Sequence, residues 1–126
     1  SYLFFFSSKN NNELKRTLLM DLLNFSGEIS INPSNPIGYF YFAEFYYKRE
    51  QYRKALKYYK KAYELGYDTN YDTLYKIGDI YQKFGDTKLA LQFLSQAAKY
   101  DPSDNLLNKI KKIDALHSMN KEYYSK

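Results

Sequence analysis

Several residue types are scarce in this chain of 126 residues, and each scarcity excludes a class of structure or chemistry. Cysteine is absent, which excludes disulfides, thiolate nucleophiles and cysteine-based metal sites. Only 3 prolines and 5 glycines occur, which favours long helices over long irregular loops. The single histidine, His117, lies beside Ser118, and neighbours on a helix cannot face each other as members of a catalytic triad must.

Long apolar runs are missing as well. No segment approaches the roughly 20 apolar residues that a membrane-spanning helix needs. The apolar run Tyr2–Phe6 is shorter than the core of a signal peptide and has no basic flank before it. We therefore expect no membrane span, and the sequence leaves the compartment open.

Aromatic residues are abundant, at 20% of the chain, with 16 tyrosines and 9 phenylalanines. Together with a hydrophobic share of 44%, they provide enough apolar surface for a packed core, so disorder is not expected. The length suits one domain, residues 1–126. A net charge of +5 permits acidic partners or nucleic acid but is well short of a polybasic tail.

The chain contains an internal repeat. Residues 36–69 and 71–104 align with an offset of 35 residues, and each window places large and small side chains at steps of three and four, on one face of two successive helices. The matched positions are Tyr39, Phe42, Ala43, Tyr46, Tyr52, Ala55, Tyr59 and Ala62, then Leu74, Ile77, Gly78, Tyr81, Thr87, Ala90, Leu94 and Ala97. Small residues opposite large ones predict two antiparallel helix pairs that interlock closely.

Local signals predict where these helices begin and end. Asn35-Pro36 is typical of an N-cap followed by proline at the first helical position, and Gly66 suits a left-handed residue after a helix. Gly85-Asp86 predicts the turn inside the second pair. The expected helices cover about 36–49, 52–65, a segment ending near 84 whose cap is one of Asp68, Asn70 or Asp72, and a segment ending near 100.

This pattern resembles the tetratricopeptide repeat. The second window matches the family motif best, through Leu74, Ile77, Gly78, Tyr81, Gly85, Asp86, Ala90, Leu94, Ala97 and Pro102. The first window departs at two places, because Ala43 replaces the usual glycine and Tyr67 stands where proline is expected. The resemblance implies an all-α fold, a right-handed α-solenoid of helix-turn-helix repeats with a terminal capping helix.

The flanking segments should also be helical, because a repeat buries its apolar face only against neighbours. Residues 12–35 read as a degenerate repeat or an N-terminal helix, with a stripe at Leu14, Leu18, Leu22 and Phe25. Tyr2–Phe6 is either the remnant of a preceding helix or a strand-like segment, with a break at Asn10–Asn12. In the capping helix, residues 105–124, we expect Leu106, Ile110, Ile113 and Leu116 inside, and Lys109, Lys111, Lys112 and Asp114 on the other sides.

In this family the first helices of successive repeats line a concave face. The resemblance assigns that face, as a partner-binding surface, to Ile37, Phe40, Glu44, Tyr47, Lys48, Asp72, Tyr75, Asp79, Gln82 and Lys83. Neither the core pattern nor a cap explains Phe40, Tyr47 and Tyr75. They are either anchors for a ligand or fillers packed against the flanking helices.

One subtype of the family can be compared directly. Members that grip the C-terminal carboxylates of chaperones place lysine and asparagine on this face, where this chain has Phe40, Glu44, Tyr75 and Asp79. We expect a negatively charged groove that repels such a tail. A partner that offers apolar side chains with lysine or arginine is preferred.

The resemblance and the missing chemistry together predict a scaffold or adaptor that binds a peptide or helix of another protein, without catalysis and without a cofactor. The carboxylate pairs Asp79/Asp86 and Glu44/Glu50 fall on expected helix surfaces or turns, where solvated charge is normal. No glycine-rich phosphate loop is present.

Two alternatives remain. The basic helix 48–61, which mixes lysine and arginine with tyrosine, could bind nucleic acid, but Tyr52 and Tyr59 occupy core positions of the repeat, so this interpretation is disfavoured. The aromatic segment Tyr2–Phe6 could instead support self-association into a homo-oligomer.

Overall fold

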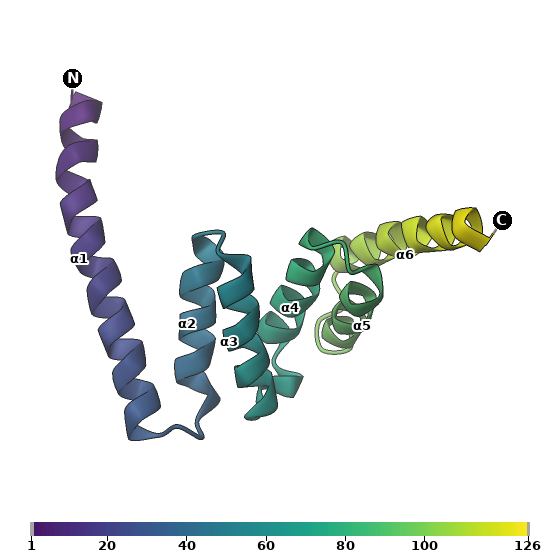
Figure 1. Cartoon of the computed structure of the whole chain (residues 1–126), viewed down its shortest axis with the longest axis horizontal. Coiled ribbons are helices and arrows are strands. Elements are labelled where there is room, and N and C mark those ends of the chain that lie inside the picture. Colours follow the sequence, from purple (N-terminus) through teal and green to yellow (C-terminus); the bar gives the residue numbers. More distant parts are fainter. Residues whose placement is uncertain (1, 126) are drawn as a thin grey trace.

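The computed structural model describes the backbone of residues 2–125 and the side chains of residue 13 and residues 15–125. This part of the chain forms an all-α, right-handed solenoid whose helices follow one another side by side (Figure 1). The elements are α1 (Tyr2–Ile31), α2 (Pro36–Lys48), α3 (Tyr52–Glu64), a 3-10 turn η1 (Tyr67–Thr69), α4 (Tyr71–Lys83), α5 (Thr87–Ala98) and α6 (Asp104–Ser125).

The predicted capping signals hold. Side-chain oxygens of Asn35, Asn70 and Asp86 accept hydrogen bonds from backbone N–H groups in the first turns of α2, α4 and α5, at 3.0, 2.9 and 3.2 Å. Gly66 and Gly85 have φ angles of 128° and 81°, a region that favours glycine, and each ends a helix. The ends of α2 to α5 therefore lie within two residues of the expected ones.

Small residues let the paired helices approach closely. Ala43, Ala55, Ala90 and Ala97 are fully buried where α2 meets α3 and α4 meets α5. At Gly78 a Cβ atom would lie 2.7 Å from Cγ of Leu94, so only glycine permits this approach of α4 to α5. The predicted small-to-large packing is thus present in both pairs.

Two core clusters join neighbouring pairs into one array. The first contains Tyr59, Ile77 and Ile80 and connects α3 with α4. The second joins Leu74 and Leu94 to Leu106 and Ile113 of α6. Leu116 is 58% exposed, so the apolar stripe expected on α6 ends one turn early, and α6 extends past α5 towards the C-terminus (Figure 1).

The helix α1 differs from the prediction, because it runs without a break through Asn10–Asn12. Asparagine lowers helix stability only modestly, unlike proline or glycine, so three in a row do not end a helix. The ring of Phe25 packs against Tyr41 and Phe42 of α2, both with centroids at 5.6 Å. The side chains of Tyr2–Phe6 and Leu14, on which other expectations rested, lie outside the described residues.

Candidate functional site

The predicted concave face draws its residues from one side of α2 and one side of α4. Steps of three and four residues place Ile37, Phe40, Glu44 and Tyr47 on one face of α2, and the same steps run from Asp72 to Lys83 on α4. The structure brings these faces together, because Tyr47 reaches Asp79 and Glu44 reaches Lys76 across the helix junction.

Asp79 is the most connected polar residue of this face, although it is only 6% exposed. Its Oδ2 atom accepts a hydrogen bond from the Tyr47 hydroxyl at 2.5 Å and lies 3.7 Å from Nζ of Lys83. Its Oδ1 atom lies 2.7 Å from Nζ of Lys109 on α6. Burial alone would raise the pKa of Asp79, but hydrogen bonds from Lys109 and Tyr47 outweigh it, so the pKa falls below its ordinary value.

Glu44 occupies the matching place on α2. Its Oε1 atom accepts a hydrogen bond from the hydroxyl of the fully buried Tyr59 and lies 3.1 Å from Nζ of Lys76 on α4. Burial, and then the hydrogen bond to Glu44, raise the pKa of Tyr59 above its ordinary value. The phenol is therefore held in its neutral, donating form.

The two junctions follow one rule. At each, a carboxylate of the earlier helix pairs with a lysine of the later helix, first Glu44 with Lys76 and then Asp79 with Lys109. Each lysine also lies over a tyrosine ring of the earlier helix, at 4.5 Å for Lys76 and 4.9 Å for Lys109. We call these four charged residues, with the rings of Tyr47 and Tyr75, the concave ladder.

The ten predicted residues therefore divide into a buried or half-buried group and an exposed group. Glu44, Tyr47, Tyr75 and Asp79 belong to the concave ladder, while Ile37 and Phe40 are half-buried beside it. The exposed members, which a ligand can touch most freely, are Lys48, Asp72, Gln82 and Lys83.

Packing contacts account for all three unexplained rings. Phe40 meets the edges of Tyr59 and Tyr67 at 6.1 and 5.5 Å, so Tyr67 packs at the place where the family motif has proline. Tyr75 stacks on Tyr71 at 5.9 Å, and Tyr47 is fixed by Asp79. These rings are parts of the fold, and ligand contact by them stays a prediction.

Sequence reasoning missed Lys76 and placed Lys109 wrongly, on the outer side of the capping helix. The attraction of a buried carboxylate turns Lys109 inwards, and burial, which alone would lower its pKa, is outweighed by Asp79, which raises it. A signal did exist. Lys76 and Lys109 are 33 residues apart, close to the 35-residue spacing of Glu44 and Asp79.

The prediction of a negatively charged groove is wrong, because it treated two paired carboxylates as free charges. Glu44 and Asp79 are not free charges, because each is paired with a lysine and a tyrosine hydroxyl. The exposed charges on the predicted face are those of Lys48, Asp72 and Lys83, and Lys83 is paired with Asp79 at 3.7 Å. These two carboxylates, Glu44 and Asp79, are therefore not expected to repel an acidic tail.

The described part of the chain contains no group of three or more histidine, aspartate or glutamate residues placed to hold a metal ion. None of its helices combines the length and the apolar character needed to cross a bilayer.

Comparisons with known proteins agree with this geometry. A family model described as tetratricopeptide repeat matches residues 38–103. The first tetratricopeptide domain of Spaghetti matches with a TM-score of 0.69 and 15% identity, over 88% of this chain and 89% of that one. The N-terminal domain of stress-induced protein-1 from C. elegans matches with a TM-score of 0.63 and 22% identity, over 73% and 77%.

A third solved structure, that of the tetratricopeptide protein YrrB, matches with a TM-score of 0.71 and 25% identity, over 93% of this chain and 58% of that one. A search of curated proteins gave no significant match. The family model covers more than half of the chain, and the helix pairs, caps and small-residue contacts agree with it. The chain belongs to the tetratricopeptide repeat family.

Proposed function

We propose that this chain is a protein-interaction module whose concave face binds a peptide or helix of a partner protein. Family membership supports this, as do two of the solved relatives. The Spaghetti domain was solved bound to an HSP90 peptide, SRMEEVD, and YrrB is described as having an unusual peptide-binding site. The proposal involves no catalytic step.

The observation that carries the proposal is the concave ladder, together with the exposed polar residues of the same predicted face. The ion pairs and ring contacts fix α2, α4 and α6 relative to one another before any ligand arrives. A surface that is already ordered loses little conformational entropy on binding. The exposed residues, which can then select the ligand, are Lys48, Asp72, Gln82 and Lys83.

The chemistry of these residues favours a ligand with charges of both signs. Asp72 can pair with lysine or arginine, while Lys48 and Lys83 can pair with carboxylates. The positions that bear lysine and asparagine in relatives that grip chaperone tails here bear Phe40, Glu44, Tyr75 and Asp79. A chaperone tail therefore stays disfavoured, for lack of ligating groups rather than by repulsion.

Gln82 offers a direct test. It is exposed near the C-terminal end of α4, so Gln82→Trp should block the concave face without disturbing the core. Gln92→Trp, at an exposed position of α5 outside this face, is the matched control. Peptides selected from a displayed library against the unaltered chain would be measured by fluorescence anisotropy. We expect about a tenfold loss of affinity for Gln82→Trp and little change for the control. Equal binding by both variants would remove the concave face from the proposal.

A second candidate, self-association, is favoured by one observation. Leu19, Met20 and Leu23 form an apolar stripe on α1 and are 59%, 56% and 57% exposed. Light scattering over a concentration series would compare the chain with Leu19→Lys plus Leu23→Lys. A mass that rises in the unaltered chain alone supports this candidate, and a monomer throughout removes it.

A further inference from the structure

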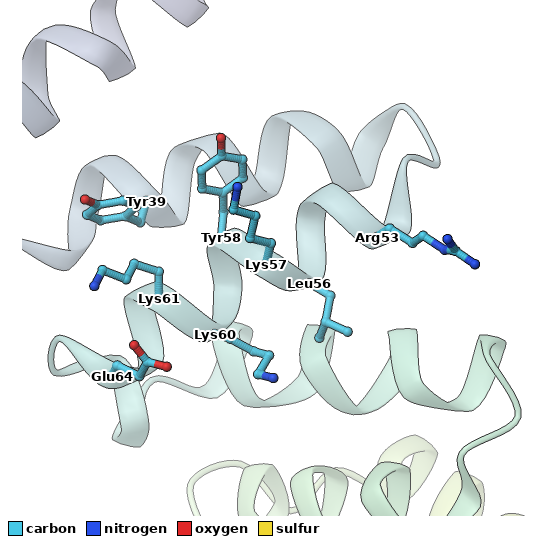
Figure 2. A pocket seen from close by; sticks show the side chains of 8 residues that line it. All are labelled: Tyr39, Arg53, Leu56, Lys57, Tyr58, Lys60, Lys61 and Glu64. Carbon is cyan, nitrogen blue, oxygen red and sulfur yellow. The ribbon is translucent and has the colours of Figure 1, made fainter.

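A second surface lies on the outer side of α2 and α3, away from the concave face. A pocket of about 650 Å³ lies there. Figure 2 shows its lining residues, with Lys57 beside Tyr58 and Lys61 beside Tyr39. The described lining residues are Tyr39, Arg53, Leu56, Lys57, Tyr58, Lys60, Lys61 and Glu64. None belongs to the concave set. Tyr39 is two residues from Ile37, which turns it about 200° around the helix.

The rim of this α3 pocket carries an excess of positive charge. Arg53, Lys57, Lys60 and Lys61 are all exposed, and Glu64 is the only carboxylate among the described lining residues. Within the described part of the chain, none of these four cations has a carboxylate oxygen within 4.0 Å. The acidic residues of the concave ladder are thus neutralised by other lysines, and this rim is left free for an anionic partner.

The spacing of these cations works against helix stability. Arg53, Lys57 and Lys61 stand at successive four-residue steps, where like charges face each other and destabilise a helix. Such a local conflict, with no ion pair inside the described part of the chain to offset it, is expected at a site that serves binding rather than folding.

The surroundings of Tyr58 and Leu56 favour an acidic polypeptide over a nucleic acid. The ring of Tyr58 is stacked on Phe42 at 5.1 Å, on Tyr46 at 5.8 Å and near Tyr39 at 6.5 Å. Since its neighbours are other rings of the chain, it offers little free face on which a nucleobase could stack. Leu56 adds an aliphatic contact, which suits the side chain of a polypeptide.

We propose that the α3 pocket binds an acidic segment of a partner protein, with carboxylates on the cations of α3 and one apolar side chain against Leu56. Arg53 and Lys61 are about 12 Å apart along the helix. That length matches about four residues of extended chain. The chain would then hold two different segments, one on each side of α2.

The probes for this proposal are short labelled peptides, measured by anisotropy at low salt. The test peptide has two glutamates on each side of one leucine. We expect it to bind, and its affinity to fall steeply as salt is added. Replacing its glutamates by glutamine, or its leucine by glycine, should weaken binding several-fold. If the glycine version binds as well as the parent, the pocket has no apolar anchor and the proposal fails.

Lys57→Glu is the matching variant of the chain, because it reverses the cation at the centre of the rim and relieves like-charge contacts instead of breaking an ion pair. Lys111→Glu, at an exposed position of α6, changes the net charge equally. We expect about a tenfold loss of affinity for the acidic peptide with Lys57→Glu and little loss with Lys111→Glu. Equal losses would mean that only overall charge matters and would overturn the proposal.

Two further arms separate the alternatives. A single-stranded uridine oligonucleotide of equal charge should bind more weakly than the peptide. If it binds more tightly, and Lys57→Glu abolishes that binding, the surface is a nucleic-acid site instead. Gln82→Trp should leave binding of the acidic peptide unchanged. The α3 pocket and the concave face can therefore fail independently.

Discussion

The Nζ atom of Lys109 lies 2.7 Å from Oδ1 of Asp79, so the last helix of the array is tied to α4 through a carboxylate that is almost inaccessible to water. Lys109 itself is only partly exposed and also reaches the Tyr75 hydroxyl, at 3.3 Å. A buried charge is costly unless it is paired, so the position of α6 and the ionised state of Asp79 depend on each other.

Replacing Lys109 by methionine should test this dependence. The change keeps an unbranched side chain but removes the ammonium group, and Asp79 then keeps only Tyr47 and the more distant Lys83. We expect a loss of about 1 to 3 kcal/mol in the free energy of unfolding, measured with urea. Lys112→Met, at an exposed position of α6, should change it by less than about 0.5 kcal/mol. Equal effects would show that the ion pair contributes nothing specific.

Acid should weaken the concave ladder through Asp79. Its pKa is lowered in the folded chain from an ordinary value of 3.8, so its stabilisation is complete above about that pH and is lost as the pH falls further. At pH 7, Asp79→Asn should cost about 2 kcal/mol of unfolding free energy. That difference should shrink between pH 4 and pH 2 in urea titrations. A difference that stays constant to pH 2 would contradict the assignment.

Lys57→Glu should stabilise the fold while it weakens the proposed acidic ligand. Residue 57 is four residues from both Arg53 and Lys61, so the change turns two repulsive contacts into attractive ones. Each contact is worth a few tenths of a kcal/mol, whether repulsive or attractive. The loss of the Lys57 ammonium 5.6 Å from the Tyr58 ring offsets part of this gain. We expect a net gain of about 0.5 kcal/mol by thermal unfolding, smaller in 1 M salt. Lys111→Glu, which creates a like-charge contact with Asp114, should show no gain.

Gly78 and Gly27 form a matched pair within helices. At Gly78 an added Cβ would lie 2.7 Å from Cγ and 3.0 Å from the backbone nitrogen of Leu94, so Gly78→Ala should force α4 and α5 apart. We expect a net loss of about 1 to 2 kcal/mol, because overpacking exceeds the gain in helix propensity. At Gly27 nothing lies within 4 Å, and Gly27→Ala should gain up to about 1 kcal/mol. A stable Gly78→Ala variant would mean that the helix pair can adjust.

The sequence was sufficient to predict α2 to α5 because the signals that end a helix are local. Asn35 and Pro36 begin α2 whatever the rest of the chain does, and Gly66 and Gly85 are the residues that adopt positive φ most easily. The small residues that set the helix contacts are equally visible, since they recur at matching positions. These features need no knowledge of distant neighbours.

The inward turn of Lys109 could not be predicted in the same way. Helical periodicity separates the apolar side of α6 from its polar sides, but it does not say which polar side meets a carboxylate 30 residues earlier in the chain. The continuity of α1 was missed for a different reason. Asn10–Asn12 carry a mild preference against helix, which the surrounding helix overrides.

The concave ladder also has a direction, because each carboxylate belongs to the earlier helix and each lysine to the later one. Lys76 and Lys109 are 33 residues apart, the length of the segment 71–103. A duplicate of that segment, inserted after Ser103, would put the new copy of Lys76 where Lys109 now stands, opposite Asp79. The original Lys109 would in turn meet the new copy of Asp79. The array is therefore able to lengthen by tandem duplication, one unit at a time, without a new kind of junction.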